Sequence, residues 1–308
     1  MDFRLSEDQR ALRRGVRELL DGRFGREALR AAVDLAVDAT EGPGPGPVLD
    51  RALWRELGAA GFFALRLPEE AGGVGLGLPE AVLVFEEAGR ALLPGPLIAT
   101  HLAAGRVPGA AEGETVVTAA DGCLVEWRDA ADVVLGDAAD AVPLRSVDPL
   151  TPLHRLPDST DEGGLDLDLD LDLDLDLVTL FTAAEQLGSA GRTTELAVAY
   201  ARTREQFGQP IGGFQAVKQL CARMLVRTEL ARAAVYAAAV TADPVEIAGA
   251  RLLADEAAVD CARDCLQVHG GMGFTWEADV HLHLKRAWVR AERGLPAAAA
   301  EERVAARL

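Results

Sequence analysis

The second half of the chain carries a long, nearly uninterrupted helical pattern of apolar residues. Over 178–242 these residues recur every three or four positions, and the pattern breaks only at 208–210, which reads Gly-Gln-Pro. Further helices are predicted over 245–268 and 279–293. Because such helices must bury their apolar faces against one another, we expect a mostly α protein with a C-terminal four-helix bundle.

The first 105 residues predict shorter helices separated by glycine and proline. Ser6, followed by acidic residues, has the features of a helix N-cap, and apolar spacing continues as far as Leu20. Residues 42–47 alternate glycine and proline, which excludes a helix interior. Two more helices are predicted over 48–60 and 78–91.

The residue pattern changes between the two helical regions. Short β-branched runs at 115–118, 123–127 and 133–135 predict a few strands. This stretch of about 45 residues is too short for a full β-sandwich. We therefore expect an N-terminal helical domain over 1–105, a truncated β-region with a linker over 106–177, and the bundle domain over 178–308.

Leucine and aspartate alternate strictly from Leu165 to Leu177. A period of two predicts a strand with every leucine on one face, whereas a helix would scatter them around its circumference. A calcium-binding loop is an alternative, but its glycine at position six and glutamate at position twelve never occur together here. The expected structure is a solvated edge strand or an expanded linker.

Charge and cysteine content exclude several classes of partner and site. The net charge is −18, so neither nucleic acid nor an anionic membrane is expected to bind. Four cysteines do not form a disulfide framework, and Cys261 and Cys265 are expected to be buried free thiols on one helix face rather than a metal site. No apolar stretch suits a signal peptide or a membrane span, so we expect a reduced cytoplasmic protein.

Two motifs in the bundle region suggest a bound nucleotide. One runs from Tyr200 to Lys218 and contains Arg204 in an RxxFG pattern, and the other runs from Gln267 to Asp279 and contains HGGMG. An arginine suits bidentate contact with pyrophosphate, and glycine backbone amides can approach a phosphate closely. Each motif alone also has an ordinary structural explanation, as a helix C-cap or as a tight turn.

Together, in this order and about 60 residues apart, the motifs closely resemble those of the acyl-CoA dehydrogenases. The resemblance covers the helical N-terminal region, including 67–77 (LPEEAGGVGLG), and the whole C-terminal half, and it implies that fold. In the family these residues hold the ADP half of FAD across a subunit interface. The matching cofactor-binding residues here are Arg204, Gln206, Phe207, Ile211, Phe214, Gln215, Gln267, Gly270 and Gly271.

Other family features are missing. The middle β-domain of family members carries a Thr-Glu-Pro-x-x-Gly-Ser-Asp loop that supports the flavin ring and the thioester, and 105–164 contains nothing like it. The catalytic glutamate of the family lies in one of two places. One is a Tyr-Glu-Gly-Thr motif, where 288–295 reads WVRAERGL, and the other falls on Val178. The adjacent family arginine that contacts CoA falls on Thr179.

These losses concern the chemical step. Desaturation removes a proton from the thioester Cα while a hydride leaves Cβ for the flavin, and the proton needs a carboxylate that valine lacks. Glu185 lies on the same helix face as Val178, roughly 10 Å along it, and is expected to be a solvated helix residue. His269 could carry a proton, but a structural role at the helix end is expected. We assign no catalytic residue and no metal site to this chain.

The resemblance therefore implies a non-catalytic subunit of a heteromeric FAD-dependent acyl-CoA dehydrogenase. A full-length partner would bring the β-domain, the main acyl-CoA contacts and the glutamate, as in the α2β2 enzymes of actinobacterial steroid side-chain degradation, and an electron-transfer flavoprotein would accept the electrons. Two alternatives remain open. One is a self-sufficient homo-oligomer with a relocated base such as Glu185, and the other is a flavin-free subunit kept for assembly.

Overall fold

The computed structural model describes residues 4–41, 49–157 and 173–307. The chain divides into two compact units. Unit 1 consists of Met1–Leu20, Val82–Leu93 and Thr179–Leu308, and unit 2 consists of Asp21–Ala81 and Pro94–Val178. The three domains expected over 1–105, 106–177 and 178–308 stay a prediction.

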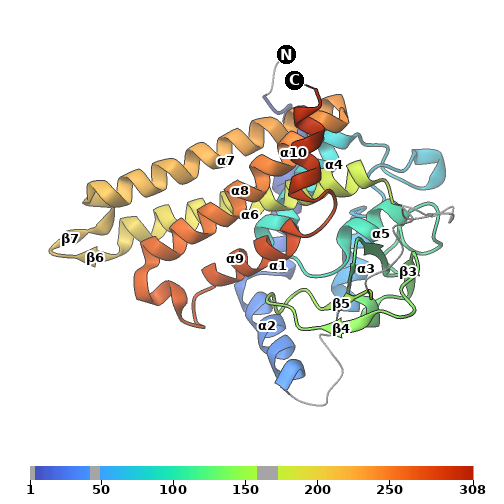
Figure 1. The fold of residues 1–308 in the computed structure, drawn as a ribbon, viewed down its shortest axis with the longest axis horizontal. Helices are drawn as coiled ribbons and strands as arrows, with labels where there is room; N and C mark the ends of the chain where they lie inside the picture. The colour runs from blue at the N-terminus through green and yellow to red at the C-terminus, as the bar shows by residue number, and fades with distance from the viewer. Residues whose placement is uncertain (1–3, 42–48, 158–172, 308) are drawn as a thin grey trace. The chain divides into compact units, whose positions relative to one another are not determined.

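Long helices dominate unit 1, as the sequence predicted. They are α6 (Leu175–Thr203), α7 (Gln215–Thr241), α8 (Pro244–His269) and α9 (Val280–Ala291). Figure 1 shows α6, α7 and α8 side by side in yellow to orange, and α9 packs against α8. The buried face of α8 consists largely of alanines, which lets its neighbours approach closely. A further helix that the sequence analysis missed, α10 (Ala297–Ala305), also packs against α8.

Two shorter helices complete unit 1. In α1 (Glu7–Arg23), Ser6 Oγ accepts a hydrogen bond from the Gln9 amide, and Gln9 Oε1 accepts one from the Ser6 amide, so the predicted N-cap is confirmed as a reciprocal capping pair. The helix α4 (Leu78–Ala91) meets α6 at two glycines. A methyl group added at Gly89 would overlap the Glu185 carbonyl, and one added at Gly188 would overlap the Glu86 carbonyl. The two backbones are therefore in direct contact.

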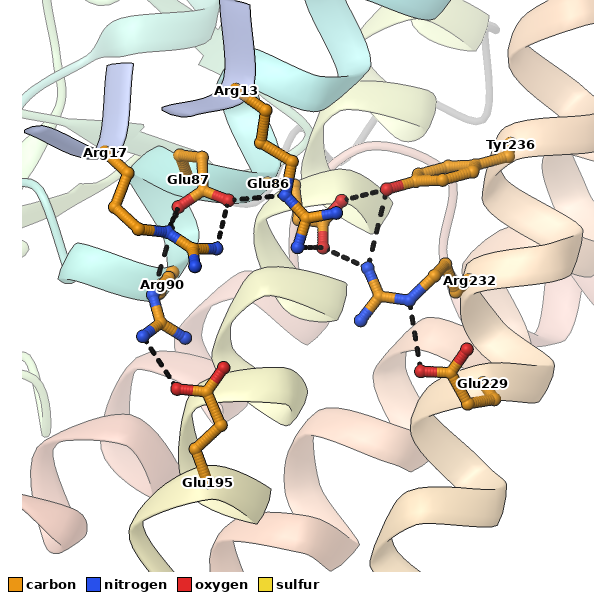
Figure 2. A network of polar contacts seen from close by, with 9 residues as sticks. All are labelled: Arg13, Arg17, Glu86, Glu87, Arg90, Glu195, Glu229, Arg232 and Tyr236. Carbon is orange, nitrogen blue, oxygen red and sulfur yellow. Dashed lines mark hydrogen bonds and ion pairs between the residues drawn. The ribbon is translucent and has the colours of Figure 1, made fainter. Parts of the chain in front are cut away.

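A network of charges ties α4 to its neighbours within unit 1 (Figure 2). Glu87, only 2% exposed, accepts hydrogen bonds from Arg13 Nε at 2.9 Å and from Arg17 Nε at 2.8 Å. Glu86 pairs with Arg232 and accepts a 2.6 Å hydrogen bond from the Tyr236 hydroxyl. The network continues outward through the pairs Arg90–Glu195 at 2.6 Å and Arg232–Glu229 at 3.2 Å. Such pairing is what allows carboxylates to be buried among helices.

Unit 2 contains the predicted strands within a small sheet. The strands are β1 (Val117–Asp121), β2 (Leu124–Glu126), β3 (Val133–Leu135), β4 (Val142–Leu144) and β5 (Leu153–Arg155), in the order β3-β1-β2-β5-β4. The strands β4 and β5 were not predicted from the sequence. All neighbours are antiparallel except β1 and β3, which are parallel.

Three helices accompany this sheet in unit 2. The helix predicted over 48–60 is α3 (Arg51–Ala59), capped by the Asp50 carboxylate, and its apolar face is buried as expected. The other two, α2 (Arg26–Glu41) and α5 (Leu97–Ala103), were not predicted. In the described part of the chain, no helix is both long enough and apolar enough to cross a membrane.

Two helix boundaries correct the sequence analysis. Most of the alternating Leu-Asp run, up to residue 172, lies outside the described residues, but its last three residues, 175–177, form the first turn of α6 instead of a strand. Asp174 explains this start, because its side chain accepts hydrogen bonds from the amides of residues 176 and 177. At the other end, α6 stops at Thr203 and not at Gly208.

Candidate cofactor-binding site

A short hairpin carries the RxxFG motif. The strands β6 (Glu205–Gln206) and β7 (Gln209–Pro210) pair across Phe207 and Gly208, whose φ angles are 51° and 76°. Two consecutive left-handed residues form the tight turn that matches the twist of paired strands, and glycine at the second position makes it accessible. The motif is therefore a hairpin tip, and the alternative explanation as a helix C-cap is wrong.

Backbone hydrogen bonds hold the base of this hairpin. The Arg204 amide donates to the Tyr200 carbonyl at 2.8 Å, and the Ile211 amide donates to the Arg204 carbonyl at 2.8 Å. The Ile211 side chain is 8% exposed and packs inward, so in this conformation it supports the hairpin. The Phe207 and Phe214 rings make an edge-on contact with centroids 6.1 Å apart.

The structure brings the two sequence motifs to the same end of the bundle (Figure 1). Tyr200, one turn before Arg204 on α6, stacks on His269, the last residue of α8, with ring centroids 4.1 Å apart. His269 Nδ1 lies 2.8 Å from the Cys265 carbonyl oxygen, an acceptor, so this nitrogen carries the proton. The stack and this hydrogen bond give His269 the structural role that the sequence analysis expected.

The glycine motif forms a turn directly after that histidine. Gly270 has φ 60° and ψ −142°, a conformation that favours glycine, and a 3-10 turn, η4, follows over Gly270–Phe274. Gln267 and Gly271 are exposed beside it. Large apolar side chains also point outward here, since Met272 is 53% and Phe274 is 73% exposed.

The predicted cofactor-binding residues, Ile211 aside, remain wholly or partly accessible. Arg204 is exposed, and its guanidinium has no hydrogen bond or ion pair with the described residues. Phe207 is 92% exposed at the hairpin tip. A free guanidinium, accessible glycine amides and an uncovered aromatic ring fit a nucleotide that arrives from outside the chain.

The positions that the family resemblance assigns to the base and the CoA contact are buried. Val178 is 6% exposed, and Thr179 has no exposed surface. Thr179 Oγ1 accepts a 3.0 Å hydrogen bond from the Leu295 amide. A Cβ atom added at Gly294 would lie 3.0 Å from the same oxygen, so the turn over residues 292–295 packs directly on Thr179.

An arginine that the sequence analysis missed anchors this turn. Arg251 on α8 is 1% exposed and donates to the carbonyls of Arg290 at 2.8 Å, Ala291 at 3.0 Å and Arg293 at 2.6 Å. Asp255 balances its charge at 2.6 Å. Arg251 thereby donates to carbonyls at and after the end of α9, of which that of Arg290 also accepts a 3.1 Å hydrogen bond from the Arg293 amide. The available signal was an arginine four residues before an aspartate within an alanine-rich helix.

Glu185 is not the solvated residue that the sequence analysis expected. It is 3% exposed, and its Oε2 lies 2.9 Å from Nε of Arg290, itself 3% exposed. This buried ion pair forms because Arg290 lies on α9, whose position no local sequence pattern reveals. A carboxylate held in this way has neither the solvent access nor the freedom that a relocated base needs.

The two cysteines on α8 are buried, as predicted. Cys261 and Cys265 are free thiols in the interior, and burial raises the pKa of the Cys265 thiol to about 12. A thiol held in its neutral form is a poor nucleophile. Both residues therefore act as small packing groups.

Comparisons with known proteins agree with the fold. Residues 6–109 match the acyl-CoA dehydrogenase N-terminal domain, and residues 175–293 match the C-terminal domain. The chain is 38% identical over 305 residues to acyl-CoA dehydrogenase IpdE2 of Mycobacterium tuberculosis, covering 91% of each protein. It is 35% identical to IpdE2 of Mycolicibacterium smegmatis, covering 92% of this chain and 93% of that protein.

Solved structures show the same fold. The ChsE4-ChsE5 complex from Mycobacterium tuberculosis matches with a TM-score of 0.81 at 26% identity, covering 100% of this chain and 98% of that one. Butyryl-CoA dehydrogenase of Megasphaera elsdenii matches with a TM-score of 0.79 at 18% identity, covering 100% and 99%. With both family domains matched and a relative of this identity along nearly its whole length, the chain belongs to the acyl-CoA dehydrogenase family.

Proposed function

We propose that this chain is a non-catalytic subunit of a heteromeric FAD-dependent acyl-CoA dehydrogenase. It holds the ADP portion of a flavin whose reactive ring is housed by a full-length partner subunit. That partner supplies the catalytic glutamate and most contacts to the acyl-CoA substrate, and an electron-transfer flavoprotein accepts the electrons. The reaction is α,β-desaturation of an acyl-CoA thioester.

The observation that carries the proposal is the burial of Val178 together with the closure over Thr179. A base at this place must reach the Cα proton of a bound thioester. Here the side chains are apolar or neutral and buried, and the hydroxyl of Thr179 is already bonded to the backbone of Leu295. The Gly294 turn leaves no room above Thr179 even for a methyl group without displacement. The chain thus lacks both the group and the access for proton removal.

The exposed residues of the candidate cofactor-binding site would give the chain a role in binding FAD. Arg204 would pair with the pyrophosphate of FAD, and the amides of Gly270 and Gly271 would approach a phosphate. Phe207, 92% exposed, would bury its ring against the cofactor or the partner subunit. When bound, FAD supplies the acceptor for the substrate hydride. These residues bind and orient; none moves a proton.

Two observations weigh against the alternatives. A self-sufficient enzyme with Glu185 as its base would have to break the buried pair with Arg290, which costs about 3–5 kcal/mol when one partner is lost. A flavin-free assembly subunit would have no use for the unpaired guanidinium of Arg204 beside an open glycine turn. The heteromeric reading accounts for both features.

Relatives support a proposal for the substrate class. The structure of the Tcur3481-Tcur3483 steroid ACAD has the same fold, with a TM-score of 0.77 at 22% identity. ChsE4-ChsE5 is named as a complex, and the same architecture would suit this chain as the short subunit of an α2β2 assembly. We propose a steroid side-chain CoA ester, or a related ring-bearing acyl-CoA, as substrate of the complex.

Co-purification tests the proposal. The chain is purified alone and together with the acyl-CoA dehydrogenase encoded beside it, and the flavin spectrum and its bleaching by acyl-CoA are recorded. We expect flavin and bleaching only in the complex. Bleaching by the chain alone would establish the self-sufficient enzyme, and a stable complex without flavin would establish the assembly subunit.

A matched pair of variants tests the candidate cofactor-binding site itself. Arg204→Ala removes the predicted pyrophosphate contact, whereas Arg202→Ala removes an exposed arginine near the end of α6 that lies outside the RxxFG pattern and is not a predicted cofactor-binding residue. Because a hydrogen-bonded charge pair contributes about 1.5–3 kcal/mol, FAD affinity of the complex should fall at least tenfold in the first variant and stay unchanged in the second. Equal FAD affinity in both variants would rule out the assignment of Arg204.

A further inference from the structure

Unit 2 contains a cavity that plays no part in the function proposed above. Its volume is about 320 Å³, and it lies between the segment after α3, the helix α5 and the residues that lead into α6. This volume is at the lower end of the range of about 300–1,000 Å³ typical of small-molecule sites. The cavity can therefore hold a small organic molecule.

The lining of this cavity is cationic. Among the described residues that line it, Arg66 and Arg106 contribute two guanidinium groups, and Asp174 contributes one carboxylate. His101 forms part of the wall and is neutral, because burial and the nearby Arg66 charge lower its pKa to about 4. The described lining of this cavity therefore carries more positive than negative charge, although the net charge of the chain is −18.

The Arg66 guanidinium is partly removed from water without hydrogen-bond partners to replace it among the described residues. It is partly buried, and burial lowers its pKa, with Asp174 acting on it only as a nearby opposite charge. Among the described residues it makes no hydrogen bond or ion pair. Withdrawing a guanidinium from water without a partner is costly, and an oxyanion ligand would offset that cost. Arg106 makes one 3.3 Å hydrogen bond to the Leu102 carbonyl, which leaves most of its donors available.

We propose that this cavity binds a small organic acid through its carboxylate or phosphate group, with Arg66 as the principal contact and Arg106 at the rim. The planar fork of a guanidinium matches either group with two parallel hydrogen bonds. The apolar side chains of Phe63 and Leu177 would cover the rest of the ligand. The site lies wholly within unit 2 and involves none of the residues assigned to FAD.

Calorimetric titration of the full chain tests the proposal. Succinate and methyl phosphate are the two anionic probes, and succinamide is the uncharged control. We expect saturable binding of at least one anion and none of succinamide. Binding of succinate alone assigns the site to carboxylates, and binding of methyl phosphate alone assigns it to phosphate esters. No saturable heat with either anion would overturn the proposal.

Variants distinguish binding in this cavity from non-specific attraction of anions to the protein. Arg66→Gln should weaken binding at least tenfold, and Arg66→Lys, which keeps the charge, should weaken it less. Arg145→Gln removes an exposed arginine of the same unit and should leave binding unchanged. Circular dichroism checks that each variant is folded. Equal binding by the Arg66 and Arg145 glutamine variants would overturn the proposal. Binding seen only after the aspartates within 166–172 are replaced by asparagine would overturn it too, because the unsubstituted chain would then not bind the anion.

Discussion

The same substitution at two glycines of α6 should have opposite effects on stability. Gly188 and Gly191 lie almost one turn apart in the helix. Replacing an interior helix glycine with alanine normally stabilises a helix by about 1 kcal/mol. At Gly191 the new methyl group would find its nearest neighbour 3.7 Å away, an ordinary van der Waals contact, so Gly191→Ala should stabilise the protein by up to about 1 kcal/mol.

At Gly188 the methyl group meets the backbone of α4. It would overlap the Glu86 carbonyl oxygen and lie 2.7 Å from the Arg90 nitrogen. Because backbone atoms inside a helix cannot rotate away, the upper end of the overpacking range, about 3 kcal/mol, applies. After the propensity gain of about 1 kcal/mol, Gly188→Ala should lower the free energy of unfolding by about 2 kcal/mol.

Chemical denaturation followed by far-ultraviolet circular dichroism measures both changes. The signal comes mainly from the long helices of unit 1, and the two midpoints should move in opposite directions from that of the unsubstituted protein. Gly188→Ala with a midpoint equal to or above that of Gly191→Ala would refute direct backbone contact between α4 and α6.

Three further predictions concern buried groups. Glu87→Gln removes the buried carboxylate that pairs with Arg13 and Arg17 and should cost about 3 kcal/mol in a denaturation assay. Glu229→Gln, at an exposed end of the network, should cost less than about 1 kcal/mol. Equal costs would contradict the energetic role of burial. Burial, with nearby arginines, lowers the pKa of His283 to about 3. The unfolded chain binds a proton at this histidine below about pH 6.5, whereas the folded chain does not. Lowering the pH from neutral to 5 should therefore reduce the free energy of unfolding by about 2 kcal/mol, and His283→Gln should lose that part of the pH dependence. A thiol reagent should modify exposed Cys123 quickly and Cys265 only on unfolding, which timed labelling with mass spectrometry would check.

Local sequence patterns predicted the helices that carry a strong periodic or capping signal. The helix α4 has its predicted bounds, and α8 differs by one residue at each end, because proline, glycine and aspartate mark these boundaries. The helices α2 and α10 were missed, since neither is flanked by a clear start and stop signal on both sides. The end of α6 was placed too late, because a tight hairpin and a helix C-cap both use glycine.

The candidate site was predictable only where residues adjacent in sequence form it. The hairpin from Arg204 to Phe214 and the turn after His269 could be identified as segments, and their likeness to a known family placed them in one fold. Side-chain partners from distant helices could not be predicted. The pair between Glu185 and Arg290 depends on how α9 packs against α6, and periodicity carries no information on such pairing.

If the chain is the non-catalytic subunit proposed above, the turn held by Arg251 would also make a catalytic carboxylate hard to introduce. Val178→Glu alone would bury a charge next to an apolar interior instead of presenting it to a ligand, because Leu295 and Gly294 cover the adjoining Thr179. Opening that cover would also break the hydrogen bonds that one guanidinium donates to three backbone carbonyls. On the function proposed above, several residues would have to change at once to place a catalytic base here, so the packing of the chain itself would maintain its dependence on a partner for proton removal.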